Sequence, residues 1–146
     1  MIACPECGAA ETRCEAQFHR FLALEYSDAA YGAVHHLTVV AYMLQHSSKL
    51  TAEGWLFERD LLKRILVVGA SPSEVRRKIA SDVDSGRRAF KIRSNDGRPL
   101  FDRPAWSSTI MNVRRDGPQN YCSDITDWAR ATLVDSEQVR LEKHET

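Results

Sequence analysis

Hydrophobic positions recur every three or four residues over most of this chain, which is the spacing of helices with one buried face. The periodic stretches begin at good capping residues and end at glycine or at short polar runs. They predict helices over residues 12–26, 29–46, 52–68, 72–85 and 119–133.

Capping residues support several of these helix boundaries. Asp28 and Thr51 are suitable N-caps, and 71–74 reads Ser-Pro-Ser-Glu, a capping box with proline at the first helical position. The first two helices meet at Ser27-Asp28, where the chain is expected to turn back on itself. We therefore expect these two helices to form an antiparallel hairpin.

The helical pattern is interrupted near 87–115. Apolar and basic residues alternate at 90–93, a strong turn signal follows at 94–97, and two prolines argue against a helix. This segment is expected to be a short hairpin or an irregular stretch, with 109–113 extended.

The predicted fold is mainly α, a single-domain bundle of about five helices spanning residues 1–146, with 135–146 as a frayed tail. Hydrophobic residues make up 43% and charged residues 27% of the chain, a globular balance. No apolar run approaches the ~20 residues of a membrane helix. A cytoplasmic location is the expectation, and cysteines in a reducing compartment are typically thiols or metal ligands.

The N-terminal residues 1–10 contain Cys-Pro-Glu-Cys-Gly from Cys4 to Gly8, a CPxCG motif typical of a zinc knuckle. A CxxC turn allows two thiolates to bind one ion, and glycine permits the tight turn after the second cysteine. A redox CxxC normally opens a helix after a strand, which the pattern here does not predict. A thiol-redox protein stays open as an alternative.

Zinc needs two further ligands, and the remaining cysteines and histidines supply the candidates. These are Cys14, His19, His35, His36, His46 and Cys122. His35 and His46 lie eleven residues apart on one predicted helix. At ~1.5 Å per residue their Cα atoms are ~16 Å apart, so one ion cannot bind both.

The antiparallel hairpin selects among these candidates. It places Cys14, near the start of the first helix, level with His46 at the end of the second, next to the knuckle. Cys4, Cys7, Cys14 and His46 are therefore the expected ligands of a zinc ion. A site filled by four protein ligands is structural and not catalytic. Cys122 is expected to be a core cysteine of the last helix.

His35 lies near the middle of the second predicted helix and has two interpretations. It is either a buried histidine bonded to a carbonyl or hydroxyl, or part of a pocket with Tyr31, Tyr42 and Glu25. The second interpretation suggests a small enzyme, although the chain has no P-loop, GxGxxG, HExxH or nucleophile elbow.

Charge is unevenly distributed although the formal net charge is zero. Residues 76–115 contain eleven Lys and Arg and four Asp, a net charge of +7, which leaves −7 for the rest. Such a segment could contact nucleic acid, or it could be a solvated face that pairs with the acidic remainder. The candidate contacts are Arg76, Arg77, Arg87, Arg88, Lys91 and Arg93.

The chain also resembles an uncharacterised bacterial family of small proteins grouped only as a domain of unknown function. The resemblance rests on the CPxCG motif, Cys14, the run Glu25–Val39 with Gln45-His46, and Trp128-Ala129. It implies a bacterial metal-binding helical domain and no particular activity. The expected function is a zinc-stabilised domain that binds a partner, either protein or nucleic acid, with the small enzyme around His35 and Tyr42 and the redox protein as alternatives.

Overall fold

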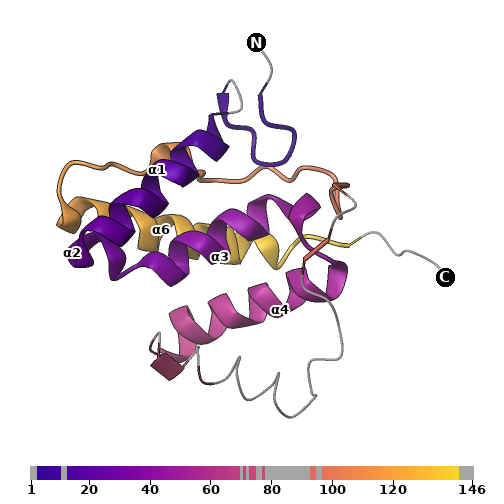
Figure 1. The fold of residues 1–146 in the computed structure, drawn as a ribbon. Helices are drawn as coiled ribbons and strands as arrows, with labels where there is room; N and C mark the ends of the chain where they lie inside the picture. The colour runs from indigo at the N-terminus through magenta and orange to yellow at the C-terminus, as the bar shows by residue number, and fades with distance from the viewer. Residues whose placement is uncertain are drawn as a thin grey trace.

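Among the residues that the structure describes, four longer helices and a short one form the body of the protein (Figure 1). They are α1 (Cys14–Ser27), α2 (Ala29–Gly32), α3 (His35–Gln45), α4 (Ala52–Lys63) and α6 (Pro118–Ser136). The mainly helical fold predicted from the sequence is confirmed. The computed structural model describes residues 3–10, 13–69, 71, 73, 74, 77, 93, 94 and 97–141.

Helix α3 is the centre of the bundle and contacts α1, α4 and α6. Figure 1 shows it between α1 and α4. A helix that packs on three neighbours needs apolar residues around most of its circumference, and α3 has them. Its buried side chains are Leu37, Thr38, Val40, Ala41, Tyr42, Met43, Leu44 and Gln45.

The second predicted helix is in fact two helices, α2 and α3, with a break at Ala33-Val34. Helix α2 packs against α1 and α6. A Cβ atom on Gly32 would lie 2.6 Å from the backbone oxygen of Glu25, so only glycine permits this close approach. The break lets the chain cross the end of α1 before α3 returns along it. The prediction of one continuous helix over 29–46 was therefore wrong.

The third and last predicted helices are present with longer or modified ends. Helix α4 begins at the predicted cap Thr51, whose hydroxyl accepts a hydrogen bond from Gly54 N at 2.9 Å. It continues as a π-helical turn over Arg64–Val68. Helix α6 begins at Pro118 and extends to Ser136. Val139 and Leu141 pack against the core, so the packed chain continues past the predicted start of the tail.

The described part of the predicted irregular segment lacks regular strands. Its contact with the rest of the chain includes one isolated antiparallel bridge, Leu50 with Arg93. Residues 109–113 are not extended as expected, because Ile110–Asn112 forms a 3-10 turn. Thr109 and Asn112 close a capping box around this turn.

Most of the helix predicted over 72–85 lies outside the described residues. At its start, the Ser71 hydroxyl accepts a hydrogen bond from Glu74 N at 3.2 Å, as the capping box predicts. Within the part of the chain that the structure covers, none of the helices has the length and apolar character to cross a membrane.

Buried polar side chains fix the packing of α3 on α6. The Gln45 amide donates to Ser108 O at 2.7 Å and to Thr132 Oγ1 at 3.1 Å. Its oxygen accepts from Trp128 Nε1 at 3.2 Å. Since Gln45 is only 1% exposed, these bonds satisfy a buried amide and fix the position of the residue that precedes His46.

Candidate metal centre

The CPxCG motif folds as a compact knuckle. Gly8 N donates to Cys4 O at 2.8 Å and Cys4 N donates to Ala9 O at 2.8 Å. Gly8 has φ 85°, a conformation that favours glycine, and the turn brings Ala9 N within 3.4 Å of Cys7 Sγ. The knuckle therefore presents both sulfur atoms on its inner side and donates a backbone N–H to one of them.

Side chains from distant parts of the sequence hold this knuckle in place. Arg103 Nη1 donates to Cys4 O at 3.1 Å, and Trp106 Nε1 donates to Glu6 O at 2.9 Å. The Glu6 carboxylate accepts from the backbone N and the hydroxyl of Ser48, both at 2.8 Å. The loop before α6 and the turn after α3 thus fasten the knuckle to the bundle.

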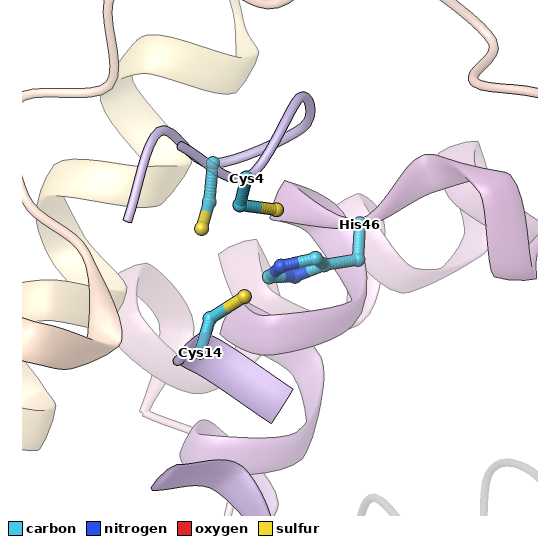
Figure 2. Close-up of side chains that lie close together, drawn as sticks. Cys4, Cys14 and His46 are labelled. Atoms are coloured by element: carbon cyan, nitrogen blue, oxygen red, sulfur yellow. The ribbon is translucent and has the colours of Figure 1, made fainter. Parts of the chain in front are cut away.

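Four potential ligand atoms converge below the knuckle. The sulfur atoms of Cys4, Cys7 and Cys14 and a ring nitrogen of His46 all lie within 4.8 Å of one another. Figure 2 shows the Cys4 and Cys14 sulfurs directed toward the His46 ring. All four residues are buried, at 3–6% exposure. The antiparallel path of α1 and α3 brings Cys14 and His46 together, as the hairpin argument predicted.

The His46 ring is oriented with one nitrogen toward the sulfurs. Nδ1 lies 2.7 Å from Tyr42 O and donates to it. That carbonyl is available because His46 N bonds Met43 O instead, at the tightened end of α3. Nε2 is buried and has no hydrogen-bond partner in the described chain. A metal-binding histidine typically donates its second ring nitrogen to a carbonyl in this way.

Two aromatic rings extend this arrangement outward from the site. Tyr42 stacks on His46 with ring centroids 4.0 Å apart, and Phe18 stacks on the other face of Tyr42 at 3.9 Å. The stack leaves His46 little freedom to rotate, so its free nitrogen is held in position by packing as well as by the Tyr42 carbonyl.

The protonation of the cysteines reflects their crowding. The pKa of Cys14 is lowered to about 4, first by its hydrogen bond with Cys7 and further by His46. The pKa of Cys7 is raised well above its ordinary value, because its proton is shared with Cys14 and its thiol is buried. The protein alone thus favours a thiolate at Cys14, and a cation among the sulfurs would favour the thiolate form of the others.

The four residues fit a zinc ion. Zinc binds thiolates at ~2.3 Å and imidazole at ~2.0 Å in a tetrahedron, which places neighbouring ligand atoms roughly 3.8 Å apart. Atoms already within 4.8 Å of one another reach that geometry with shifts of about 1 Å. Three sulfurs and one nitrogen are a donor set that suits zinc. The buried imidazole nitrogen without a partner is the feature that the protein alone does not explain.

The comparison with protein families agrees with the resemblance seen in the motifs. The model of the Family of unknown function (DUF5946) matches residues 2–137. The chain belongs to DUF5946. No curated protein and no solved structure matches it. The family is one of unknown function, so membership alone implies no particular activity.

The motif residues of this DUF5946 chain have four distinct roles in the structure. Asp28 caps α2 by accepting from Ala30 N at 2.9 Å. Gln45 and Trp128 form the buried link between α3 and α6. His46 is the ring beside the three sulfurs, and Glu25 forms a second buried cluster.

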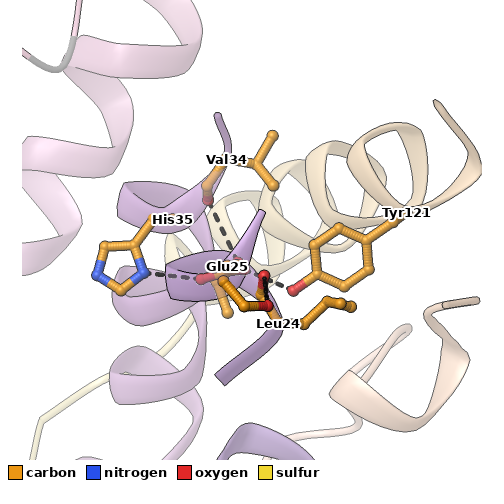
Figure 3. Close-up of polar contacts among 7 residues, drawn as sticks. Leu24, Glu25, Val34, His35 and Tyr121 are labelled. Carbon is orange, nitrogen blue, oxygen red and sulfur yellow. Dashed lines mark hydrogen bonds and ion pairs between the residues drawn. The ribbon is translucent and has the colours of Figure 1, made fainter. Parts of the chain in front are cut away.

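The second cluster, drawn in Figure 3, lies where α1 ends and α3 begins, at the opposite end of the pair from Cys14 and His46. The Glu25 carboxylate accepts from His35 Nδ1 at 2.7 Å, from Thr38 Oγ1 at 2.5 Å and from Tyr121 OH at 2.5 Å. Its side chain is fully buried, whereas that of His35 is 34% exposed. His35 is therefore bonded to a carboxylate, and not to the carbonyl or hydroxyl of the simpler expectation.

The four residues of the predicted pocket do not all come together. His35 and Tyr42 line one hollow between α1 and α3, and Glu25 lies directly behind His35. Tyr31 lies on α2, where its hydroxyl donates to Arg115 O at 3.1 Å and accepts from Gly117 N at 3.0 Å. The break between α2 and α3 separates Tyr31 from the face that carries His35 and Tyr42.

The remaining candidates are spread over the surface or lie outside the described residues. Arg77 and Arg93 are exposed, and the other four predicted nucleic-acid contacts are not described. His19 is exposed on α1, 3.8 Å from Glu15. Cys122 is half-buried, and not the core cysteine expected, with its sulfur 3.4 Å from Ala30 O. The four predicted nucleic-acid contacts that lie outside the described residues are Arg76, Arg87, Arg88 and Lys91.

Sequence reasoning missed the residues that hold the knuckle. Arg103 and Trp106 lie about a hundred positions from Cys4 and Glu6, in a segment without regular structure. The sequence identifies Arg103 only as one of the eleven basic residues of 76–115. A tryptophan and an arginine around Pro104 in an irregular loop were the available signal, because such residues need partners when they pack against a core.

Proposed function

We propose that this chain is a zinc-binding helical domain in which Cys4, Cys7, Cys14 and His46 bind one structural zinc ion. The observation that carries the proposal is the buried Nε2 of His46, which lacks a partner among the described residues and faces three sulfur atoms. A buried polar atom without a partner costs about 1–3 kcal/mol, and an ion at this position would remove that cost.

A structural role for the ion follows from the number and burial of its ligands. Four protein ligands complete a tetrahedron, so no position is left for water or a substrate. When bound, zinc would link the knuckle and the start of α1 to the end of α3, which lies about thirty residues further along the sequence. These links support a role like that of a disulfide, compatible with a reducing compartment.

The arrangement favours metal binding over thiol–disulfide chemistry. A disulfide between Cys4 and Cys7 would use only two of the four groups that converge here and would leave Cys14 and His46 outside the bond. A redox CxxC also needs an accessible thiol for exchange, and all three cysteines here are at most 6% exposed.

Metal analysis of purified protein tests this proposal. We expect one zinc per chain in the wild type and in Cys122→Ser, which changes a cysteine outside the cluster. Cys7→Ser should lose most of the metal. Metal-free wild type with cysteines that oxidise and reduce reversibly would overturn the proposal in favour of the redox alternative.

We further propose that the zinc-stabilised domain binds a partner through its basic segment. Support comes from the charge of +7 over residues 76–115 and the exposure of Arg77 and Arg93. Two members of the segment are already engaged within the fold. Arg103 binds the knuckle, and Arg114 pairs with Asp124 at 2.9 Å.

Salt dependence separates the two kinds of partner. Binding to nucleic acid should weaken steeply with added salt and with Arg87→Ala/Arg88→Ala. Arg114→Ala is the matched control, because this arginine is held by Asp124. Nucleic-acid binding that does not depend on salt concentration, or that Arg114→Ala reduces equally, would contradict a nucleic-acid partner. A protein partner would then remain.

A further inference from the structure

The groove between α1 and α3 forms a hollow of about 380 Å³ next to the candidate metal centre. This volume lies within the range of about 300–1,000 Å³ typical of small-molecule sites. Its middle is apolar, with Phe18 and Leu22 from α1 and Val39 and Met43 from α3. The two ends carry different polar groups, and each end has a defined chemistry.

One end is formed by His35 and Tyr26. Glu25, fully buried behind the ring, holds Nδ1 of His35 at 2.7 Å, and Tyr26 packs beside the ring with centroids 5.0 Å apart. Nε2 of His35 has no partner among the residues that the structure describes, and the ring lines the hollow. A buried carboxylate behind an imidazole fixes which nitrogen is offered to a ligand.

The other end carries positive charge. Lys49 follows the end of α3, and Arg93 reaches the hollow with its guanidinium 3.8 Å from Met43 Sδ. Within the described chain, Lys49 has no carboxylate partner. The one acid that lines this end is Glu15, which lies 3.8 Å from His19 on the same helix. Burial raises the pKa of the half-buried Glu58, and the nearby positive charge of Arg93 partly offsets this rise.

The two ends are too far apart for a compact ligand to reach both. Met43, which touches Arg93, follows His35 by eight residues on α3, so their Cα atoms lie about 12 Å apart. An occupant that uses both ends must be elongated, with an apolar middle that matches the apolar floor of the hollow.

We propose that this hollow binds an elongated amphipathic anion of the medium-chain acyl carboxylate class. Its carboxylate lies between Lys49 and Arg93, and its chain lies along Phe18 and Val39. A hydroxyl or carbonyl at the far end bonds to His35 Nε2. The proposal concerns a binding site separate from the Cys3His cluster and does not depend on which metal that cluster holds.

Three probes dissect the site in the purified full chain: decanoate, 1-decanol and 10-hydroxydecanoate, each below its micellar or solubility limit. Binding is measured by calorimetry and located by amide chemical-shift changes. We expect decanoate to bind at least about fivefold more tightly than decanol, because only decanoate carries the charge that Lys49 and Arg93 recognise. We expect 10-hydroxydecanoate to bind more tightly still, through His35.

Matched variants assign each part of the ligand to a residue. Lys49→Met/Arg93→Met should remove the preference for decanoate over decanol. His35→Phe should remove only the extra affinity of 10-hydroxydecanoate. Arg20→Met is the control, since Arg20 lines a separate hollow with Arg13 and Arg115. It should change nothing.

Two results would overturn the proposal. One is equal affinity for decanoate and decanol in the wild type. The other is a set of shift changes centred on the hollow of Arg13, Arg20 and Arg115. Because the wild-type chain itself supplies both measurements, a variant that fails to fold does not leave the question open.

Discussion

The two ends of the α1–α3 pair each bury a polar cluster, and the clusters differ in whether their hydrogen bonds are complete. At one end, three donors satisfy the Glu25 carboxylate. At the other, three sulfurs meet the His46 ring, whose Nε2 has no partner in the described chain. A complete cluster stabilises a fold by itself, whereas an incomplete one indicates a ligand.

Removal of metal should give the largest effect. Structural zinc binds with about 10–16 kcal/mol in small domains, so chelation of the wild type should lower the free energy of unfolding by more than about 4 kcal/mol. Urea denaturation with and without a chelator measures this change. Cys7→Ser should already be destabilised and should respond little to chelator. A wild-type curve that chelator does not move would contradict the difference between the clusters.

Glu25→Ala should destabilise by about 3 kcal/mol while leaving the metal content unchanged. The substitution removes the common acceptor of Tyr121, Thr38 and His35, and buried donors without partners account for the cost. Glu25→Gln should cost less, because an amide oxygen still accepts. Thermal unfolding with metal analysis of the same samples tests both points. Loss of zinc from a folded Glu25→Ala variant would show that the two clusters are not independent.

Stability should fall in alkaline solution through the Glu25 cluster. Burial, and then the neighbouring Glu25, raise the pKa of Tyr121 above its ordinary value of 10.0. The folded chain keeps this proton where the unfolded chain loses it, so the contribution is full below about pH 10 and is lost as pH rises further.

The comparison of wild type with Tyr121→Phe isolates this contribution. Burial also raises the pKa values of Tyr42 and Cys122, so the wild-type slope alone is not specific. Between about pH 10 and pH 11 the wild type should lose about 1 kcal/mol more than the variant. Parallel urea-derived stability profiles would argue against a buried neutral Tyr121.

Trp106→Phe should give the smallest effect and act on the metal end alone. It removes the indole N–H that donates to Glu6 O at 2.9 Å, which should lower the free energy of unfolding by about 1 kcal/mol. Loss of a group that orients the ligands should weaken metal affinity by about tenfold. Competition with a chromophoric chelator measures this affinity. Val134→Ala, at a residue that is 60% exposed, is the control and should leave affinity unchanged.

The helices and the Cys3His cluster could be predicted because helical periodicity and the CPxCG motif are local patterns and the hairpin needs only the order of two helices. Helical periodicity placed α1, α4 and α6 to within a few residues, and CPxCG indicated a knuckle. The hairpin argument needed only that Cys14 begins one helix and that His46 follows the other. The break at Ala33-Val34 does not affect that argument, because it lies at the far end of the pair.

The parts that could not be predicted depend on contacts between distant residues. Tyr121 reaches Glu25 across 96 positions, and Trp106 reaches Glu6 across 100. No local pattern specifies such pairs. The sequence groups Tyr31 with His35 because residues four apart share one face of a continuous helix. Gly32 and the close approach of α2 to Glu25 end that helix, which is a tertiary effect that sequence spacing does not reveal.

The absorption spectrum of the chain loaded with one equivalent of Co²⁺ tests the central claim most directly. Cobalt in place of zinc reports both geometry and ligand type. The account predicts tetrahedral ligand-field bands and thiolate charge-transfer bands whose intensity falls by about a third in Cys14→Ser and persists in His46→Ala. A six-coordinate spectrum without thiolate bands, or one unchanged in Cys14→Ser, would contradict a site made of Cys4, Cys7, Cys14 and His46.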